Sequence, residues 1–571
     1  MRTLFIAFLA VLVAIPAISQ IPDNAVALED ASFNTQFTSA AIPKVTGKIL
    51  NLPADQYQKT LITYSLVTPF AKRQHKKTTT PSQDGSFTLQ IDYPFPYQQI
   101  WLSVGDFYYA GIYANKDLYV ELDFSKISPH KEVNFNGDGV EYLGSDGAFN
   151  SFMNNYILYK REDQLRLSKK MYNLANKARS SQDDCVASFD SLFDSIKQID
   201  DSYLAANPSP YGWVLENERM SEYYGQLCTA HWGKVIKDSL WQKIKQHKSY
   251  LVSNNSTDYY DYMLNYIKIN PANVFETSWK DIATLPDLSL QEKALIDSLR
   301  TSEKKKGSSP YTTANIKKWS QQLSSRTYKF ATEKRLSLIT HQLDSIFPPA
   351  KADFLKLALN TTNDLSEEQS ALRQLTQSMH TFWCATVANN QYEQVTARVK
   401  EINQVLAASA NNKQPTTFGT PIIQTPYGAS LYKASPGITA TDFLAMLKQH
   451  LPGKAIIIDR WATWCAPCIG EMPHSKSLQL ASGDLPVAFV YLCTMNGSSE
   501  AQWKSKVIEL EQPGLHFLID EKLDAAISSY FSFSGYPGYA FIDKSGKYKP
   551  GAFSWLSEIE NKEKLAALIN N

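Results

Sequence analysis

A pair of cysteines directly after a strongly apolar segment constrains this chain more than any other feature. Cys465 and Cys468 are separated by Ala-Pro, and they follow the run Ala455–Asp459, which contains three consecutive isoleucines. Such a run before a Pro-containing segment is typical of a buried strand that leads into a helix. At this spacing one sulfur can attack a foreign disulfide and the other can resolve the mixed disulfide. The spacing therefore predicts a redox-active pair at a strand-to-helix junction.

The other cysteines do not suggest a metal site or a disulfide scaffold. Six cysteines in 571 residues are too few for a fold that disulfides hold together. The chain has no second close pair for zinc, and Ile469 stands where a covalent haem motif needs histidine. The sequence thus predicts no metal and no cofactor. We expect Cys493 to be a small buried apolar residue, and a disulfide between two of the remaining thiols stays open. The remaining thiols are Cys185, Cys228 and Cys384.

Length and charge limit the classes of protein that fit. A chain of 571 residues predicts several domains, because a single core does not grow this large. The 57 Lys and Arg residues nearly balance the 56 Asp and Glu residues. Since nucleic-acid binding needs a basic excess, we do not expect a nucleic-acid partner.

The first 19 residues have the pattern of a signal peptide. Arg2 precedes the apolar run Leu4–Ile15, and Ala17 and Ser19 are small residues at the two cleavage positions. An apolar run of about 12 residues is too short to span a bilayer, and no later segment is long and apolar enough. We expect a mature chain from Gln20 that is exported without stable membrane insertion. The expected compartment is the periplasm of a Gram-negative bacterium.

Periodicity divides the mature chain into three regions, which predicts a multidomain fold. Short alternating strands predict an antiparallel β-sandwich-like domain over residues 45–137, after an N-terminal segment of residues 20–44. Long helical patterns predict a central all-α domain over residues 138–407. The polar stretch 408–417 is predicted to be a linker. Strands and helices then alternate over residues 418–571, which predicts an α/β layered domain.

Two motifs of the last region resemble the thioredoxin superfamily. The stretch Ile458–Cys468 resembles the thioredoxin active-site signature. Its continuation to Pro473 resembles the TlpA/ResA branch of exported bacterial thiol-disulfide oxidoreductases. The stretch Gly535–Gly546 resembles the cis-proline turn, edge strand and hairpin of that family. The resemblance implies a thioredoxin-like fold for residues 418–571, with N-terminal β and helical accessory domains as in long TlpA-like proteins.

The cysteine spacing and the resemblance together predict the roles of the reacting groups. Cys465 is expected to be an exposed nucleophile, because a helix N-terminus favours its thiolate. Cys468 lies one turn further in and is expected to resolve the mixed disulfide, which leaves a Cys465–Cys468 disulfide. The resemblance matches Asp459 to the buried acid of thioredoxin and Glu471 to the acid of the TlpA/ResA branch. Either carboxylate would accept the proton of Cys468, and a solvated helix residue is the alternative for Glu471.

The resemblance also implies a docking edge for the substrate. Pro537 is expected to be cis, and the backbone at Tyr536 is expected to pair with an extended substrate. Trp464 is expected to shield the sulfurs and to contact substrate, whereas Trp461 is expected to belong to the core. Gly538 departs from the family, which usually has Thr or a similar residue there, and predicts extra backbone freedom beside the groove.

The resulting hypothesis is an exported thiol-disulfide oxidoreductase that exchanges disulfides with protein substrates, as a reductant. Its partners would be protein disulfides or dithiols and a membrane or periplasmic electron donor. Two alternatives stay open. In the first, the N-terminal regions recognise a partner in the envelope and the redox pair only regulates binding. In the second, the protein is a thiol peroxidase that reacts through Cys465.

Overall fold

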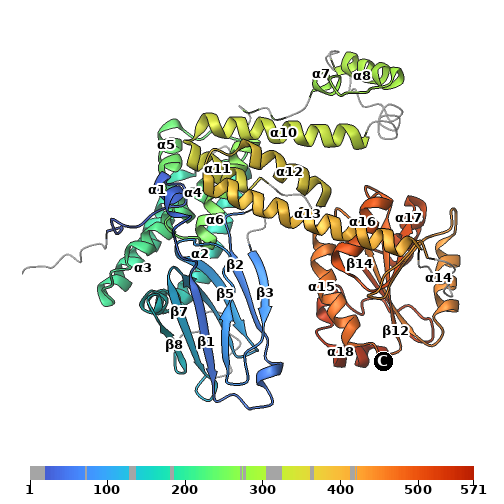
Figure 1. Ribbon diagram of the computed structural model, residues 1–571, viewed down its shortest axis with the longest axis horizontal. Coiled ribbons are helices and arrows are strands. Elements are labelled where there is room, and N and C mark those ends of the chain that lie inside the picture. Colours follow the sequence, from blue (N-terminus) through green and yellow to red (C-terminus); the bar gives the residue numbers. More distant parts are fainter. Residues whose placement is uncertain are drawn as a thin grey trace, which may run out of the picture. The chain divides into compact units, whose positions relative to one another are not determined.

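The computed structural model of the chain (Figure 1) has two compact units. One unit comprises Met1–Thr361 with Gln374–Ala388, and the other comprises Thr362–Arg373 with Asn389–Asn571. The described residues are 20–570 without 71–73, 128–136, 181–184, 271–272, 274, 276–277, 304–323, 360–364, 412–417 and 419–420. The predicted signal peptide lies outside the described residues. No helix in the described part of the chain combines the length and the apolar character that crossing a membrane requires.

The first unit begins with two four-stranded sheets that share one apolar core. Their strand orders are β4-β1-β7-β8 and β3-β2-β5-β6. Buried side chains alternate with more exposed ones along β1, because successive residues of a strand point to opposite faces. The strands are β1 (Lys44–Leu50), β2 (Ile62–Val67), β3 (Gln74–Thr79), β4 (Ser86–Leu89), β5 (Gln98–Val104), β6 (Tyr108–Ala114), β7 (Asp117–Asp123) and β8 (Val140–Leu143).

Two details differ from the predicted antiparallel β domain. Strands β1 and β7 pair in parallel, with Val45 opposite Leu118, so the first sheet is mixed. The chain reaches β7 only after it has built the second sheet, and this crossover lets β7 run in the direction of β1. Strand β8 lies within the region predicted to be helical and closes the edge of the first sheet on β7.

Helices form the rest of the first unit. A core cluster that includes Phe189, Tyr259 and Trp383 joins several of them. The helices are α1 (Ala31–Gln36), α2 (Gly147–Ser180), α3 (Val186–Ala206), α4 (Trp213–Ala230), α5 (Asp238–Gln246), α6 (Asn254–Ile269), α7 (Trp279–Ile282), α8 (Leu290–Glu303), α10 (Ser324–Ile346) and α11 (Pro349–Leu357). Helices α12 (Leu365–Ser378) and α13 (Phe382–Asn411) contribute residues to both units.

The boundaries of the two units differ from the predicted division at residue 407. Helix α13 runs on to Asn411, so it includes the first residues of the predicted linker, and residues 412–417 lie outside the described part. The reason is packing: Ile402 is buried in the apolar core of the second unit, and Arg398 donates to the carbonyl of Glu509 there. The finer division of the first unit into a β domain and a helical domain stays a prediction.

The second unit is built on a six-stranded sheet of order β14-β11-β12-β13-β10-β9. The four central strands are parallel, and β14 and β9 pair antiparallel at the two edges. The strands are β9 (Ile423–Gln424), β10 (Ala429–Lys433), β11 (Ala455–Trp461), β12 (Val487–Thr494), β13 (Gly514–Ile519) and β14 (Gly538–Ile542). The helices are α14 (Ala440–His450), α15 (Ala466–Ala481), α16 (Glu500–Leu510), α17 (Glu521–Phe531) and α18 (Lys562–Asn570).

The helices cover both faces of this sheet, as an α/β layered fold requires. One apolar cluster joins Ile457 of β11 to Met472 of α15 and Val507 of α16. A second cluster joins Ile456 and Ile458 of β11 to α14 and α17 on the other face. Figure 1 shows α15 and α14 on opposite sides of the sheet. Strand β11 is buried along its whole length, in agreement with the isoleucine run that predicted it.

Candidate active site

The two closely spaced cysteines form a disulfide at the start of α15. Cys465 is the N-cap residue of this helix, and its Sγ accepts a hydrogen bond of 3.2 Å from the backbone N–H of Cys468. Pro467 lies in the first turn, where no intrahelical N–H bond is lost. The expectation of an exposed Cys465 is wrong for this disulfide form, since Cys465 is only 3% exposed and Cys468 is fully buried. The Cys465 sulfur lies in the core cluster because it caps the helix and is bonded to Cys468.

Asp459 and Arg460, two neighbouring residues of β11, point to opposite faces of the sheet. Residues 455, 457 and 461 of this strand belong to the core cluster that contains Cys465 and Cys468, whereas residues 456 and 458 face α14 and α17. Because side chains alternate along a strand, Asp459 faces the side of α15 and the disulfide. Arg460 faces the side of α17.

Asp459 is a buried carboxyl group without a hydrogen-bond partner. It is 1% exposed, and both carboxyl oxygens lack a hydrogen bond in the described residues. Burial raises its pKa to about 8, and the charge of Glu471 contributes to the rise. A carboxyl group with this pKa titrates close to a thiol, whose ordinary pKa is about 8.5. The group can therefore exchange a proton with a neighbouring thiol at little cost.

Two tyrosines flank Asp459 on the neighbouring strands. Tyr491 of β12 and Tyr539 of β14 are its direct cross-strand partners. The Tyr491 hydroxyl is already bonded, to Ser475 Oγ at 2.6 Å and to Gln512 Nε2 at 2.6 Å. The Tyr539 hydroxyl is buried without a hydrogen-bond partner in the described residues. Burial raises the pKa of Tyr539, and the nearby charge of Asp459 adds to this rise, so the hydroxyl keeps its proton.

Glu471 lies on α15, one turn beyond Cys468, and is half-buried. Its Oε2 accepts a hydrogen bond of 2.9 Å from the backbone N–H of Ser557. This contact fixes the carboxylate at the end of the 3₁₀ turn Leu556–Glu558 and leaves its other oxygen available. Glu471 is therefore neither fully solvated nor buried like Asp459.

The second motif forms a turn that a charged network holds in place. The Tyr536–Pro537 bond is cis, as the resemblance implies. The guanidinium of Arg460 donates to both carboxylate oxygens of Asp524, at 2.7 and 2.9 Å, and to the Gly535 carbonyl at 3.0 Å. Its Cζ lies 3.8 Å from the centroid of the Tyr536 ring, which is a cation–π contact. The Tyr536 hydroxyl donates to Asp524 at 2.7 Å, so both the ring and the hydroxyl of Tyr536 have a partner in this network.

The aromatic residues around the pair have distinct environments. Trp464 is 49% exposed and donates from Nε1 to the Asn496 carbonyl at 2.8 Å, while its ring meets Tyr536 edge-on at 5.3 Å. It is thus available to a substrate. Trp461 is fully buried, which confirms the expected core position. The glycine at 538 has a packing reason: a Cβ there would lie 2.9 Å from the Phe533 ring, so the predicted backbone freedom is not what the position requires.

The remaining cysteines do not take part in the disulfide: Cys493 lies in the same core cluster as the pair, and the other three belong to the first unit. Cys493 is a buried thiol whose pKa burial raises, in agreement with the expected apolar role. Cys228 and Cys384 are also buried thiols outside any disulfide, and Cys185 is half-buried.

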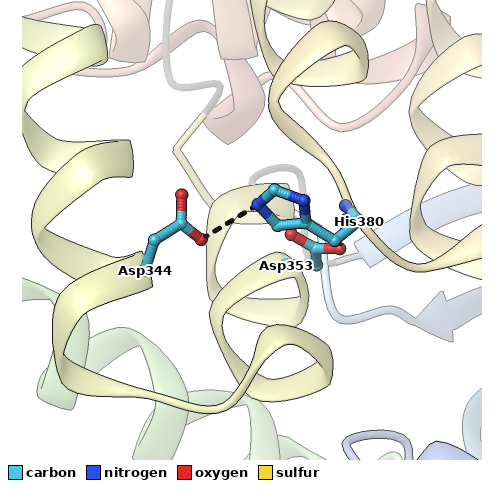
Figure 2. Close-up of side chains that lie close together, drawn as sticks. All are labelled: Asp344, Asp353 and His380. Atoms are coloured by element: carbon cyan, nitrogen blue, oxygen red, sulfur yellow. Dashed lines mark hydrogen bonds and ion pairs between the residues drawn. The ribbon is translucent and has the colours of Figure 1, made fainter.

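One group of side chains has the composition of a metal site, in the first unit. Figure 2 shows Asp344 of α10, Asp353 of α11 and His380 close together. The ammonium of Lys356, which is fully buried, already lies 2.8 Å from Asp344 and 2.9 Å from Asp353. The other oxygen of Asp353 accepts the backbone N–H groups of His380 and Thr381. The Lys356 ammonium therefore already occupies the place between these two carboxylates, and the cluster has the features of an internal ion pair.

Sequence reasoning did not identify Arg460, Asp524, Tyr491 or Tyr539. Arg460 and Asp524 are 64 positions apart, and no local pattern joins them. Tyr491 and Tyr539 could have been found only by aligning the neighbouring strands with Asp459, since their relevance comes from register.

Comparison with known proteins relates part of the chain to one group. No family model matches the chain. The thioredoxin-like protein YneN of Bacillus subtilis is 29% identical over 119 residues, which cover 20% of this chain and 66% of that protein, just under two thirds of its length.

Solved structures that match part of the chain include two from Bacteroides vulgatus. The thioredoxin domain of a thiol-disulfide oxidoreductase from Bacteroides vulgatus is 18% identical, over 21% of this chain and 81% of that chain, with a TM-score of 0.18. A second structure from this organism, of a thiol-disulfide oxidoreductase, is 24% identical, over 28% of this chain and 86% of that chain, with a TM-score of 0.20. Over 119 residues the chain is thus similar to a thioredoxin-like protein.

Proposed function

We propose that the second unit is a thioredoxin-like thiol-disulfide oxidoreductase that reduces protein disulfides through Cys465 and Cys468. The observation that carries the proposal is the disulfide at the N-terminus of α15, with the buried Asp459 on the same side of the sheet. The similarity to a thioredoxin-like protein over part of the chain supports it.

The reaction follows from the reduced form of the pair. The Cys465 thiolate attacks one sulfur of the substrate disulfide, so a mixed disulfide forms and the other substrate sulfur leaves as a thiolate. Cys468 then gives its proton to Asp459 or Glu471 and attacks the Cys465 sulfur, which releases the second substrate thiol. The substrate gains two electrons, and the Cys465–Cys468 disulfide of this structure is the oxidised product. A dithiol protein of the membrane or periplasm would have to return the two electrons.

The turn before β14 would dock the substrate. Tyr536 and Pro537 lie at its end, and an extended substrate segment would pair with the backbone there. The exposed Trp464 would contact the same segment. The N-terminal signal pattern supports export to the periplasm, which sequencing the N-terminus of the chain from a periplasmic fraction would test.

Turnover of a disulfide protein such as insulin, with dithiothreitol as electron donor, tests the proposal. We expect Cys465→Ser to abolish turnover and Cys468→Ala to accumulate a mixed disulfide that mass spectrometry identifies. Cys493→Ala removes a buried thiol outside the pair and should turn over like wild type. Equal turnover by wild type and Cys465→Ser would refute the proposal.

The direction of exchange is tested separately by equilibrium with glutathione. A reductant should have a potential near that of thioredoxin, about −270 mV, whereas an oxidant would lie near about −120 mV. Rapid consumption of hydrogen peroxide through Cys465, without exchange with insulin, would favour the peroxidase alternative instead.

A further inference from the structure

The first unit contains a cavity of about 630 Å³ to which the proposed redox function assigns no role. Its walls come from β5, β6, α2, α3, α4 and the start of α6, all within that unit. Cavities of this size are typical of sites for small ligands.

Part of the cavity wall is aromatic and apolar. Trp101 of β5, Tyr113 of β6 and Tyr156 of α2 line it together with Met153 and Leu215. Tyr113 and Tyr156 are largely buried, and the Tyr156 ring already has a cation, the ammonium of Lys160, 5.6 Å from its centroid. Aromatic faces attract organic cations, especially where water is excluded.

Two carboxylates of α4 line the same cavity. Glu218 and Glu222 are four residues apart, so they lie one above the other on one face of the helix. Glu218 accepts a hydrogen bond of 2.6 Å from Ser253 Oγ. Within the described residues, no cation lies within ion-pair distance of either carboxylate. Lys160, whose charge acts on both, forms no ion pair with them in that part of the chain.

The third acid of the cavity is already neutralised. Asp200 forms a buried ion pair with Arg219 and accepts the hydroxyl hydrogen of Tyr156. The charges of Asp200 and Arg219 therefore cancel. The other cations of the cavity wall are the more distant Lys160 and the exposed Arg161 at the rim. A site with two half-buried carboxylates gains from a further cation, because partial burial of a carboxylate without an ion-pair partner is costly.

We propose that this cavity binds an ammonium group, presented by a lysine side chain of a peptide. Glu218 and Glu222 accept its N–H donors, and the rings of Trp101 and Tyr113 cover its apolar stem. A peptide is favoured over a free polyamine because the cavity combines one acidic pair with an apolar wall, which fits one charge on an aliphatic chain. The first unit would then recognise a basic segment, whether or not the second unit exchanges disulfides.

Proton release gives this binding a signature. Burial raises the pKa of Glu218 to about 7, so its carboxyl group titrates near neutral pH. A bound cation lowers that pKa, and binding at pH 7 should therefore release protons, whereas binding at pH 9 should not. The charged and titratable groups that face Glu218 and Glu222 are Tyr156, Lys160, Arg161, Asp200, Arg219, Tyr113 and Asp258.

Isothermal titration of the full chain tests the site. The probes are N-acetyl-lysine amide, its uncharged counterpart N-acetyl-norleucine amide, and spermidine, each in phosphate and in Tris buffer. We expect the lysine probe to bind at least about tenfold more tightly than the norleucine probe, and Glu218→Gln or Glu222→Gln to weaken it by about tenfold. The control is Glu216→Gln, an exposed glutamate on the same helix, which should bind like wild type.

Three outcomes would overturn the inference. They are the absence of lysine-probe binding at concentrations up to about 10 mM, equal affinity of wild type and a correctly folded Glu218→Gln, and binding of spermidine without the lysine probe. Circular dichroism of each variant establishes that it is folded. Loss of insulin reduction in Cys465→Ser leaves this binding unchanged, so the two proposals fail independently.

Discussion

Replacing Arg460 with methionine is the most direct test of how the turn before β14 is held. The change keeps a long side chain but removes two hydrogen bonds to Asp524, one to the Gly535 carbonyl and the contact with the Tyr536 ring. Asp524 then keeps the Tyr536 hydroxyl as a hydrogen-bond donor. We expect the turn to lose its fixed position relative to β11.

The magnitude follows from burial. Both side chains of the Arg460–Asp524 pair are only 8% exposed. Removing one partner of a buried ion pair costs about 3–5 kcal/mol, because the other charge stays buried without compensation. The double variant Arg460→Met/Asp524→Leu replaces both charges with apolar groups and should recover most of this loss. The two substitutions are thus expected to be strongly non-additive.

Hydrogen–deuterium exchange of the full chain, followed by mass spectrometry, measures the effect locally. Peptides that cover β11 and β14 should exchange about a hundredfold faster in Arg460→Met, as expected for a loss of about 3 kcal/mol. Lys433→Met is the control, since Lys433 pairs with Glu500 at the surface and such pairs contribute at most about 1 kcal/mol. Exchange within about fivefold of wild type, or a double variant as unstable as the sum of its parts, would refute the reasoning.

Two further predictions concern buried charges. Asp459 has a pKa of about 8 against an ordinary value of 3.8, so the unfolded chain loses this proton first and stability should fall as pH rises from about 4 to 8. In Asp459→Asn, the decrease in the free energy of unfolding over this pH range should be smaller by an amount on the order of 5 kcal/mol. Denaturant unfolding at different pH values measures this decrease, and a pH dependence equal to that of wild type would contradict the prediction. Lys356→Met should destabilise the first unit by about 3–5 kcal/mol in thermal unfolding. Zinc should not raise the melting temperature of the wild type, and a zinc-dependent rise would show that the cluster with Asp344 is a metal site.

Local sequence patterns predicted the parts of the fold that depend on neighbouring residues. The isoleucine run became the fully buried strand β11, because a strand covered on both faces needs apolar side chains throughout. The start of α15 at Cys465 was also predictable, since Pro467 suits the first turn of a helix. The core position expected for Trp461 as an aromatic packing residue is also confirmed.

Contacts between distant segments escaped prediction. The parallel pairing of β1 with β7 depends on where the chain crosses between sheets, which alternation within a strand does not encode. Arg460 directly follows Asp459 in sequence, yet the two face opposite sides of the sheet and act on different helices. Helix α13 belongs to two units because Ile402 packs in the apolar core of the second unit. Helical periodicity alone does not indicate which core a helix will pack against.

The buried ammonium of Lys356 occupies a position where other folds hold a metal ion. Where carboxylates converge, many folds recruit calcium or zinc and then depend on the supply of that ion. Here the neutralising charge is covalently part of the chain, held by Asp344, Asp353 and the Ser378 carbonyl at 2.7 Å. Chelators cannot extract it, and dilution cannot remove it. The contacts of this cluster thus do not depend on the supply of a metal ion.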